Sequence, residues 1–282
     1  MRIVQIIDTL DLLGGAQKMQ VAFAEAVQGM NLSLTVITLE DGSQGTALPN
    51  KLAALGADVH FFPAPRLWSV SRLGKLIRFL QNGRFDVAHT NLTYANIVGV
   101  LAARLAKIPT VAGIRNAFNQ PRRFHQIRAA LETFTLNFLV QRIMAVGQAT
   151  AQAHQRRVPY KPIVAIPNSV VIPKPVDPAV RLEVRAALLD HPERPLLITV
   201  GRLTKQKGYS DLLQAFALLL NSHPDARLGI VGDGELYAAL QQEMKDLNLA
   251  DKAFLLGRRE DVPDLLAASD IFVSSSHWEG LS

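Results

Sequence analysis

The chain has 282 residues, which is long for one domain and sufficient for two. Hydrophobic residues make up 49% of it and charged residues 19%, so packed cores are expected, with apolar surface left for a partner or a membrane. There is no cysteine, which excludes disulfides and thiolate metal sites and suits a reducing cytoplasm. No run of 18 apolar residues occurs, and the amino-terminal stretch lacks the small-residue cleavage site of a signal peptide.

Strands and helical patterns alternate along the first part of the chain. The apolar runs predict strands at 2–7, 32–39, 59–62, 86–89, 110–114, 142–146 and 163–166. Apolar side chains spaced by three and four predict helices at about 16–27, 49–55, 73–80, 95–106, 122–139 and 148–156. This alternation is typical of an α/β fold, in which helices cover both faces of a parallel sheet.

Prolines mark the one strong change in composition, with six of them between Pro159 and Pro178. We therefore expect a first domain at 1–167, a linker at 168–190 and a second domain at 191–282. The second domain restarts the alternation, with strands at 196–200, 227–231, 253–256 and 270–274 and helices at 209–221, 235–247 and 262–268. Because the sequence stops soon after the last strand, we expect that the second domain is incomplete and that the chain is cut within a loop.

Positive charge gathers in one part of the chain. The net charge is +6, yet the segment from Arg115 to Lys161 holds eight Lys or Arg residues and a single acidic residue, Glu132. This charge suits an anionic partner such as a phospholipid surface or a lipid diphosphate. Nucleic acid is the least favoured partner, because aromatic residues do not alternate with these cations as they do on a base-stacking surface.

The helix expected at 122–139 carries a stripe of apolar residues beside some of these cations. The stripe consists of Phe124, Ile127, Leu131, Phe134 and Phe138, and the cations are Arg122, Arg123 and Arg128. Two interpretations remain open. The stripe packs against the sheet as core, or it lies with its cations on an anionic membrane surface where a lipid-linked acceptor would be found.

A basic loop follows the first strand of the second domain, in the stretch Leu196–Gly208 (LLITVGRLTKQKG). Gly201 ends the strand. Arg202, Lys205 and Lys207 follow within six residues, and a helix begins directly after them. Free amides, the helix dipole and these cations all favour anionic oxygens, although a solvated loop is the alternative. Its position at the carboxyl end of a strand, where open α/β sheets bind ligands, favours a phosphate site.

The first domain offers candidates at the ends of its strands. Gly14 and Gly15 follow the first strand and allow the backbone to approach a phosphate or an acceptor at a helix N-terminus, with a plain tight turn as the alternative. His89 and Arg115 end neighbouring strands that face one cleft, and they are the acceptor-side candidates. For His89, a structural role inside the fold is equally compatible with the sequence.

Several short motifs occur together in a characteristic order. They are Gly14–Gln17 (GGAQ), Ile166–Val170 (IPNSV), Gly201–Gly208, Val231–Leu236 (VGDGEL), the segment 254–272 and the terminal pair Glu279–Gly280. With these motifs the whole chain resembles the retaining glycosyltransferases of family 4, which have the GT-B architecture of two Rossmann-like domains. Family members continue past the terminal pair and have a second glutamate at what would be position 287.

The resemblance implies an enzyme that moves a hexose from a UDP- or GDP-sugar to a hydroxyl of a glycan or a lipid-linked acceptor. The family's counterparts of Arg202 and Lys207 neutralise the leaving diphosphate, and the counterpart of Glu279 holds hydroxyls of the donor sugar. These three residues are the catalytic candidates. The remaining donor-binding candidates are Gly14, Gly15, Gly201, Gly257 and Arg258, of which the last two lie where the backbone touches the nucleobase.

Neither a metal ion nor another cofactor is expected. The chain has no Asp-x-Asp pair to hold a divalent cation, and the fork of Arg202 with the ammonium of Lys207 can bind a diphosphate instead. The chain departs from the family at Arg115, where many members have histidine. A role as a base is therefore not expected for Arg115, whereas phosphate or acceptor binding is.

Three alternatives are weighed against this interpretation. One is a sugar-nucleotide epimerase of the same architecture, which the lack of a carboxylate-rich cleft disfavours. Another is a two-lobed binding protein without chemistry, which would normally carry an export signal. The third is an inactive fragment. We expect a cytoplasmic location, with peripheral contact at the inner face of the membrane.

Overall fold

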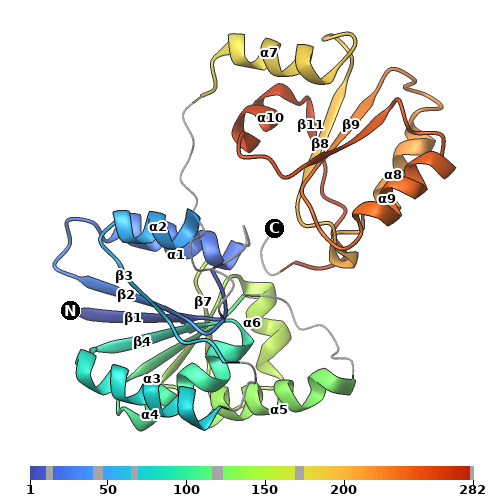
Figure 1. Ribbon diagram of the computed structural model, residues 1–282. Coiled ribbons are helices and arrows are strands. Elements are labelled where there is room, and N and C mark those ends of the chain that lie inside the picture. Colours follow the sequence, from blue (N-terminus) through green and yellow to red (C-terminus); the bar gives the residue numbers. More distant parts are fainter. Residues whose placement is uncertain (11–14, 41–46, 65–68, 116–122, 169–174, 280–282) are drawn as a thin grey trace. The chain divides into compact units, whose positions relative to one another are not determined.

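A computed structural model describes residues 1–10, 15–40, 47–64, 69–115, 123–168 and 175–279, with side chains at 123–125 left out. The described chain forms two compact units, Met1–Val171 and Ile172–Glu279 (Figure 1). Each unit has its own parallel sheet and its own core, and each is considered separately below.

The first unit is built on a seven-stranded parallel sheet in the order β3-β2-β1-β4-β5-β6-β7. Its strands are β1 (Arg2–Ile7), β2 (Ser33–Thr38), β3 (Asp58–Phe61), β4 (Val87–Asn91), β5 (Thr110–Ile114), β6 (Arg142–Ala145) and β7 (Ile163–Ala165). The interior strand β1 is apolar apart from its first residue and Gln5, and it is buried beyond its first residue. A strand covered on both faces needs such a largely apolar run, which suits its interior place in the sheet.

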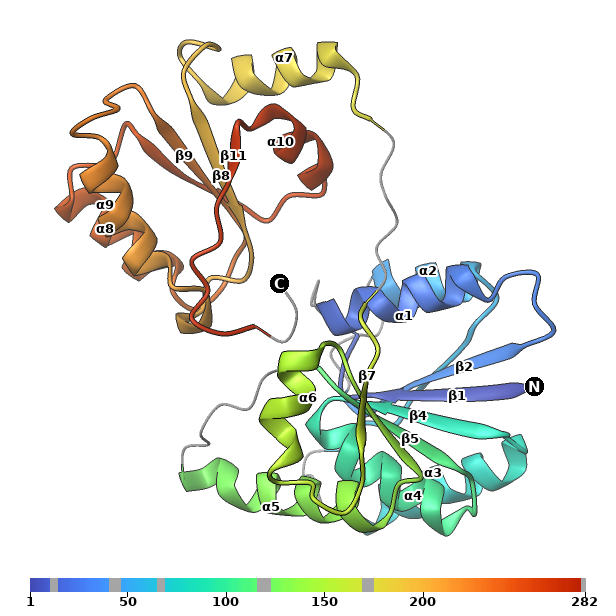
Figure 2. The same cartoon turned by 180° about the vertical axis from the view of Figure 1, so that it is seen from behind.

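Helices cover both faces of this sheet, as Figures 1 and 2 show from opposite sides. They are α1 (Gly15–Ala26), α2 (Ala47–Ala54), α3 (Val70–Gly83), the π-helical turn η1 (Ala95–Gly99) that runs into α4 (Val100–Leu105), α5 (Arg123–Phe138) and α6 (Gln148–Gln155). Alternate residues of β1 serve the two faces. Ile3 and Ile7 pack in the core with α1 and α2, whereas Val4 and Ile6 pack in the core with α3 and α4.

The second unit contains a four-stranded parallel sheet in the order β10-β9-β8-β11. Its strands are β8 (Leu196–Val200), β9 (Arg227–Val231), β10 (Ala253–Gly257) and β11 (Ile271–Phe272). Its helices are α7 (Pro178–Leu188), the 3₁₀ turn η2 (Lys205–Lys207), α8 (Tyr209–Leu219), α9 (Tyr237–Asp246) and α10 (Val262–Ala268). The α/β class and the two Rossmann-like units expected from the sequence are thus confirmed.

The structure corrects the expected linker at 168–190. The units divide after Val171, and most of the remaining stretch is helix α7 of the second unit. Asp177 caps this helix by accepting a hydrogen bond from the amide of Ala179, and Pro178 occupies its first turn. The buried Arg185 then anchors α7 by donating to the carbonyl oxygen of Ala268 and to the carboxylate of Asp270. The last proline of the cluster, Pro178, therefore begins a helix, because proline is well suited to the first helical turn.

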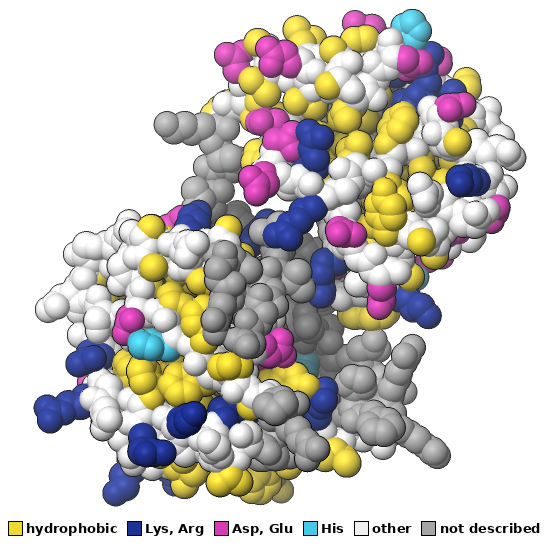
Figure 3. Space-filling model, in the orientation of Figure 1, with side chains coloured by type: hydrophobic (Ala, Val, Ile, Leu, Met, Phe, Trp, Pro, Cys, Tyr) yellow, Lys and Arg dark blue, Asp and Glu magenta, His cyan; other side chains and the backbone are white. Residues whose placement is uncertain are grey.

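Helix α5 follows the usual amphipathic rule only in part, because Leu136 is buried in the core while other apolar residues face outward. Its apolar residues Ile127, Phe134 and Phe138 are 72%, 53% and 57% exposed, whereas Glu132 and Asn137 are buried. The core interpretation of the stripe is therefore wrong for these three apolar residues, although Leu131 is half-buried against the core. In Figure 3, hydrophobic side chains reach the surface at the lower edge of the view, where α5 runs.

Hydrogen bonds explain why α5 can bury its polar side. The carboxylate of Glu132 accepts from the Asn96 side chain at 3.1 Å and from the Arg157 guanidinium at 2.9 Å. The Thr135 hydroxyl donates to the Asn96 carbonyl oxygen, and the Asn137 amide donates to the Arg157 carbonyl oxygen. Buried polar groups that are satisfied in this way have no strong reason to face water.

Candidate functional site

The basic loop lies at the carboxyl edge of the second unit's sheet. β8 ends at Val200, and the loop continues through the turn η2 to Gly208, where α8 begins. Gly208 has a φ of +60°, and a Cβ there would come within 2.2 Å of the Ser275 carbonyl oxygen. Only glycine fits this conformation and this close approach. The loop after β8 is thereby packed directly against the segment after β11.

Lys207 and Glu279 meet at this edge. The Nζ of Lys207 donates to Oε1 of Glu279 at 2.5 Å, and each side chain is about a quarter exposed. The stem of Lys207 runs past Gly201, where a Cβ would lie 3.1 Å from Lys207 Cε. The structure thus brings together three of the residues that the sequence proposed for the donor site.

Gln206 holds the segment that carries Glu279. Its side-chain amide donates to the carbonyl oxygen of Trp278 at 2.9 Å, and its own carbonyl oxygen accepts from the amide of His277. The Ser275 hydroxyl also donates to the Lys207 carbonyl oxygen at 2.8 Å. Sequence reasoning missed Gln206, because these contacts span about 70 residues and depend on the pairing of β8 with β11.

Arg202 is exposed, and in the described part of the chain its guanidinium has no ion-pair or hydrogen-bond partner. The backbone around it is fixed. The amide of Gly201 donates to the Val231 carbonyl oxygen, and the amide of Leu203 donates to that of Asp233. A Cβ on Gly232 would lie 1.9 Å from the Gly201 carbonyl oxygen, so the two loops touch through backbone alone. A free cation on a rigid loop is a suitable group for an anionic ligand.

Gly257 and Arg258 lie at the same edge, at the end of β10. Gly257 has a φ of +67° at an irregularity in the pairing with β9, and its carbonyl oxygen accepts from the amide of Gly232. Arg258 is exposed. Because all strands of this sheet are parallel, their carboxyl ends bring Gly201, Gly257 and Glu279 to one edge, which is where open α/β sheets bind ligands.

The first unit contributes a helix start after β1. Gly15 is exposed at the beginning of α1, and Gly14 lies outside the described residues. Asp8, which directly follows β1, is buried, and its two carboxylate oxygens accept from the backbone amides of Tyr94 and Ala95. Burial raises the pKa of Asp8 to about 7. Asp8 therefore serves as a cap for the turn η1 and titrates near neutral pH.

His89 is held within the sheet of the first unit. Its Nδ1 is 3.5 Å from the side-chain amide of Gln5, and its Nε2 is buried without a hydrogen-bond partner in the described structure. Burial, with the nearby charge of Arg115, lowers the pKa of His89 to about 4, so the imidazole is neutral at neutral pH. This arrangement favours the structural role for His89 over direct contact with an acceptor.

Arg115 is held by two amide side chains. Its Nε donates to Oδ1 of Asn91 at 2.8 Å, and its Nη1 donates to Oδ1 of Asn168 at 2.9 Å. Asn91 ends β4, and Asn168 follows β7, so three strands contribute to the arrangement. Asn168 belongs to the IPNSV motif that the sequence analysis identified, but the motif does not indicate that Arg115 is its partner.

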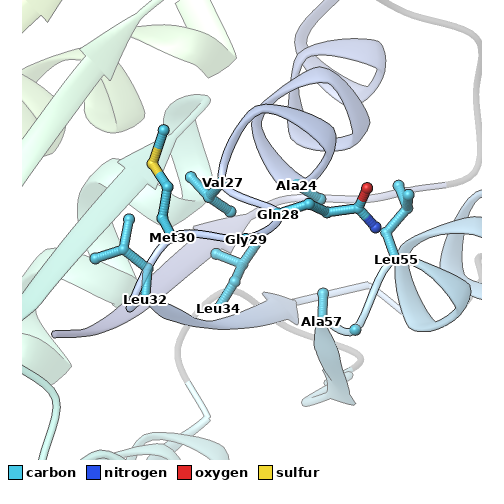
Figure 4. A pocket seen from close by; sticks show the side chains of 10 residues that line it. Ala24, Val27, Gln28, Gly29, Met30, Leu32, Leu34, Leu55 and Ala57 are labelled. Carbon is cyan, nitrogen blue, oxygen red and sulfur yellow. The ribbon is translucent and has the colours of Figure 1, made fainter.

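A pocket of about 290 Å³ lies elsewhere in the first unit. Figure 4 shows its lining, which comes from the end of α1, the start of β2 and the turn before β3. The lining side chains are apolar or small except for Gln28, and the pocket lies at the amino end of β2. It offers no charged group for a diphosphate and lies away from the carboxyl edge of the sheet.

Among the described residues, no group of three His, Cys, Asp or Glu side chains is arranged to hold a metal ion. In the same part of the chain, no helix combines the length and the apolar character that crossing a membrane requires.

Two Rossmann-like units, with a basic loop and a carboxylate at the carboxyl edge of the second, define a glycosyltransferase of the GT-B class. Residues 13–174 match the family described as Glycosyltransferase Family 4, and residues 180–282 match Glycosyl transferases group 1. The chain belongs to glycosyltransferase family 4, as the motifs predicted.

Characterised relatives agree with this assignment. The chain is 27% identical over 98% of its length to the UDP-Gal:α-D-GlcNAc-diphosphoundecaprenol α-1,3-galactosyltransferase of Escherichia coli, of which it spans 73%. It is 27% identical over 76% of its length to the 2-deoxystreptamine glucosyltransferase of Streptomyces kanamyceticus, of which it spans 59%. The crystal structure of HepE from Anabaena is 22% identical, with a TM-score of 0.81 over 98% of this chain and 74% of that one.

Proposed function

We propose that the protein transfers a hexose from a nucleoside-diphosphate sugar to an acceptor hydroxyl, with retention of the anomeric configuration. The observation that carries this proposal is the pairing of Lys207 with Glu279 beside the free Arg202, all at one edge of a parallel sheet. Cations suit a diphosphate, and a carboxylate suits sugar hydroxyls. The similar structures of Anabaena HepE hold UDP and UDP-glucose, which supports a UDP-sugar donor.

In the proposed reaction the bond between the anomeric carbon and the diphosphate oxygen breaks, and a bond from that carbon to the acceptor oxygen forms on the same face of the sugar. The acceptor proton passes to the leaving phosphate. Arg202 and Lys207 stabilise the negative charge that develops on the diphosphate. Glu279 positions the sugar through its hydroxyls. This division of roles requires no nucleophilic side chain and no metal ion.

The acceptor is proposed to be a glycan or a lipid-linked sugar. The E. coli relative, whose name gives a diphosphoundecaprenol acceptor, supports the lipid-linked choice. A lipid-linked acceptor would require the enzyme to work at a membrane surface, and the exposed face of α5 fits such a surface.

We propose that this face lies on anionic lipid. Phe134, Phe138 and Tyr160 form an exposed aromatic row, with ring centroids 5.2 and 5.5 Å apart along it. The exposed cations Arg128, Arg142 and Arg156 come from the same segment of the chain. Its single carboxylate, Glu132, is turned inward and paired with Arg157. Exposed aromatic rings and exposed cations from one segment, with no exposed carboxylate in described residues 126–165, suit an anionic lipid surface.

Donor binding and turnover test the catalytic proposal. UDP and GDP are titrated into the protein by calorimetry with and without EDTA, and transfer from each sugar nucleotide is followed with the product's anomeric configuration read by NMR. We expect UDP binding that persists in EDTA and a product with retained configuration. Inverted product, or activity that disappears on chelation and returns with one divalent metal, would contradict the proposed mechanism.

A further inference from the structure

Arg115 is a half-buried cation for which the described residues supply no counter-ion. Burial lowers the pKa of its guanidinium, which remains protonated because the ordinary value is far above neutral pH. Among the residues that the structure describes, no carboxylate lies within ion-pair distance of it, and its hydrogen-bond partners are the neutral amides of Asn91 and Asn168. Charges removed from water are normally paired, so the guanidinium of Arg115 lacks the anion that would normally accompany it.

Hydrogen-bond donors are in excess around this guanidinium. Arginine has five N–H donors, and these two hydrogen bonds use one on Nε and one on Nη1, which leaves three without a partner among the described residues. Because Arg115 can only donate, Asn91 must turn Oδ1 toward it. The Nδ2 of that same buried amide is then left without a hydrogen-bond partner in the described structure. A ligand here must supply acceptors.

The sheet makes room for this cluster. Gly113 pairs with Asn91 in the register of β4 and β5. A Cβ at Gly113 would lie 2.6 Å from Asn91 Oδ1 and 3.2 Å from His89 Nε2. Since His89 is neutral and Gly113 has no side chain, neither supplies negative charge. The site is therefore cationic, rich in donors and fixed in geometry by amides from two other strands, which suits the oxygens of a phosphate group.

We propose that Arg115, held by Asn91 and Asn168, binds a phosphate group of the acceptor. This inference rests on the proposed function. The second unit offers Arg202 and Lys207 for the donor diphosphate, and Arg115 offers a further guanidinium, in the first unit, for a phosphate-bearing acceptor. The donor diphosphate carries the same phosphate oxygens, and the titrations below distinguish donor binding from acceptor binding at Arg115.

Calorimetric titration of the protein with three probes tests the proposal. The probes are decyl diphosphate, decyl glucoside as the phosphate-free counterpart, and UDP. Arg115→Gln should weaken decyl diphosphate binding roughly 10- to 100-fold and leave UDP and decyl glucoside within about twofold. Arg104→Gln, which removes an exposed cation from α4 of the same unit, is the matched control and should change none of the three affinities.

Asn168→Asp tests the same idea without removing the arginine. It places a carboxylate 2.9 Å from Nη1, so Arg115 gains an internal counter-ion that competes with phosphate. Decyl diphosphate affinity should fall while the melting temperature stays the same or rises, which distinguishes competition from misfolding. Unchanged decyl diphosphate binding in both variants would overturn the proposal, and loss of UDP binding alone would assign Arg115 to the donor instead. If the unaltered protein bound no UDP, the proposed function would fail, and the decyl diphosphate titrations would still decide the role of Arg115.

Discussion

Removing the charge of Glu279 should make the protein bind UDP more tightly and catalyse more slowly. In the structure Lys207 is neutralised by Glu279 at 2.5 Å, so a donor diphosphate must compete with that carboxylate for the ammonium. Both side chains are about three-quarters buried, so the pair is stronger than the median surface ion pair. We take its coupling as about 1 kcal/mol, which corresponds to roughly fivefold in affinity.

Glu279→Gln should therefore lower the dissociation constant of UDP by about fivefold in calorimetry. Turnover of a UDP-sugar should fall by two or more orders of magnitude, because the carboxylate no longer positions the sugar. Lys207→Gln should weaken UDP binding instead. Glu260→Gln removes an exposed carboxylate from the loop after β10 and controls for net charge. Equal or weaker UDP binding by Glu279→Gln, or equal tightening by Glu260→Gln, would refute the competition between carboxylate and diphosphate.

Three further predictions follow from other parts of the structure. Phe134→Ser with Phe138→Ser should abolish flotation with vesicles containing phosphatidylglycerol at low salt, whereas Leu218→Ser, which changes a still more exposed apolar residue in α8, should not. Equal retention on neutral vesicles, or a dimer that the double variant abolishes, would point to another use of this face. Asp8 is ionised in the unfolded chain above about pH 4 but keeps its proton in the fold up to about pH 7, so its contribution to stability falls as pH rises between these values. In denaturant unfolding at several pH values, the free energy of unfolding of Asp8→Asn should therefore gain up to about 4 kcal/mol relative to the unaltered protein across that window. A difference between the two proteins that is independent of pH would contradict this. Gly208→Ala should lower both the melting temperature and the UDP affinity, because the positive φ of Gly208 and its contact with Ser275 exclude a side chain. A variant of normal stability would show that the loop after β8 and the segment after β11 are not packed as described.

The α/β class and most elements could be predicted from apolar runs and their spacing. Strands 110–114 and 196–200 were predicted with the bounds that the structure has, because a strand buried on both faces is apolar along its whole length. Helix α7 was not predicted, because the prolines around its start indicated a linker and the capping residue Asp177 was not taken into account. Such a cap is a local signal, so this element could have been found from the sequence.

The face of α5 could not be predicted in the same way. Apolar spacing indicates a helix, but the usual rule then places its apolar side inward. Here Glu132 and Asn137 are buried because Asn96 and Arg157, which are distant in the sequence, satisfy them. The candidate site shows the same limit. The motifs identified Arg202, Lys207 and Glu279, whereas the partners Gln206, Asn91 and Asn168 depend on contacts made only in the folded chain.

The backbone contact between the loops after β8 and β9 constrains how donor preference can change among related chains. Gly232 and Gly234 have φ values of +141° and +156°, and a Cβ on either would collide with the backbone of Gly201 or Leu203. Substitution at these glycines would distort the basic loop itself, so selection is expected to remove variation there. Under the proposed function, a change in the donor's sugar or base would instead arise at side chains that border these backbone contacts, such as those of Lys205 and Arg258. The chemistry of the loop can stay constant while its specificity evolves around it.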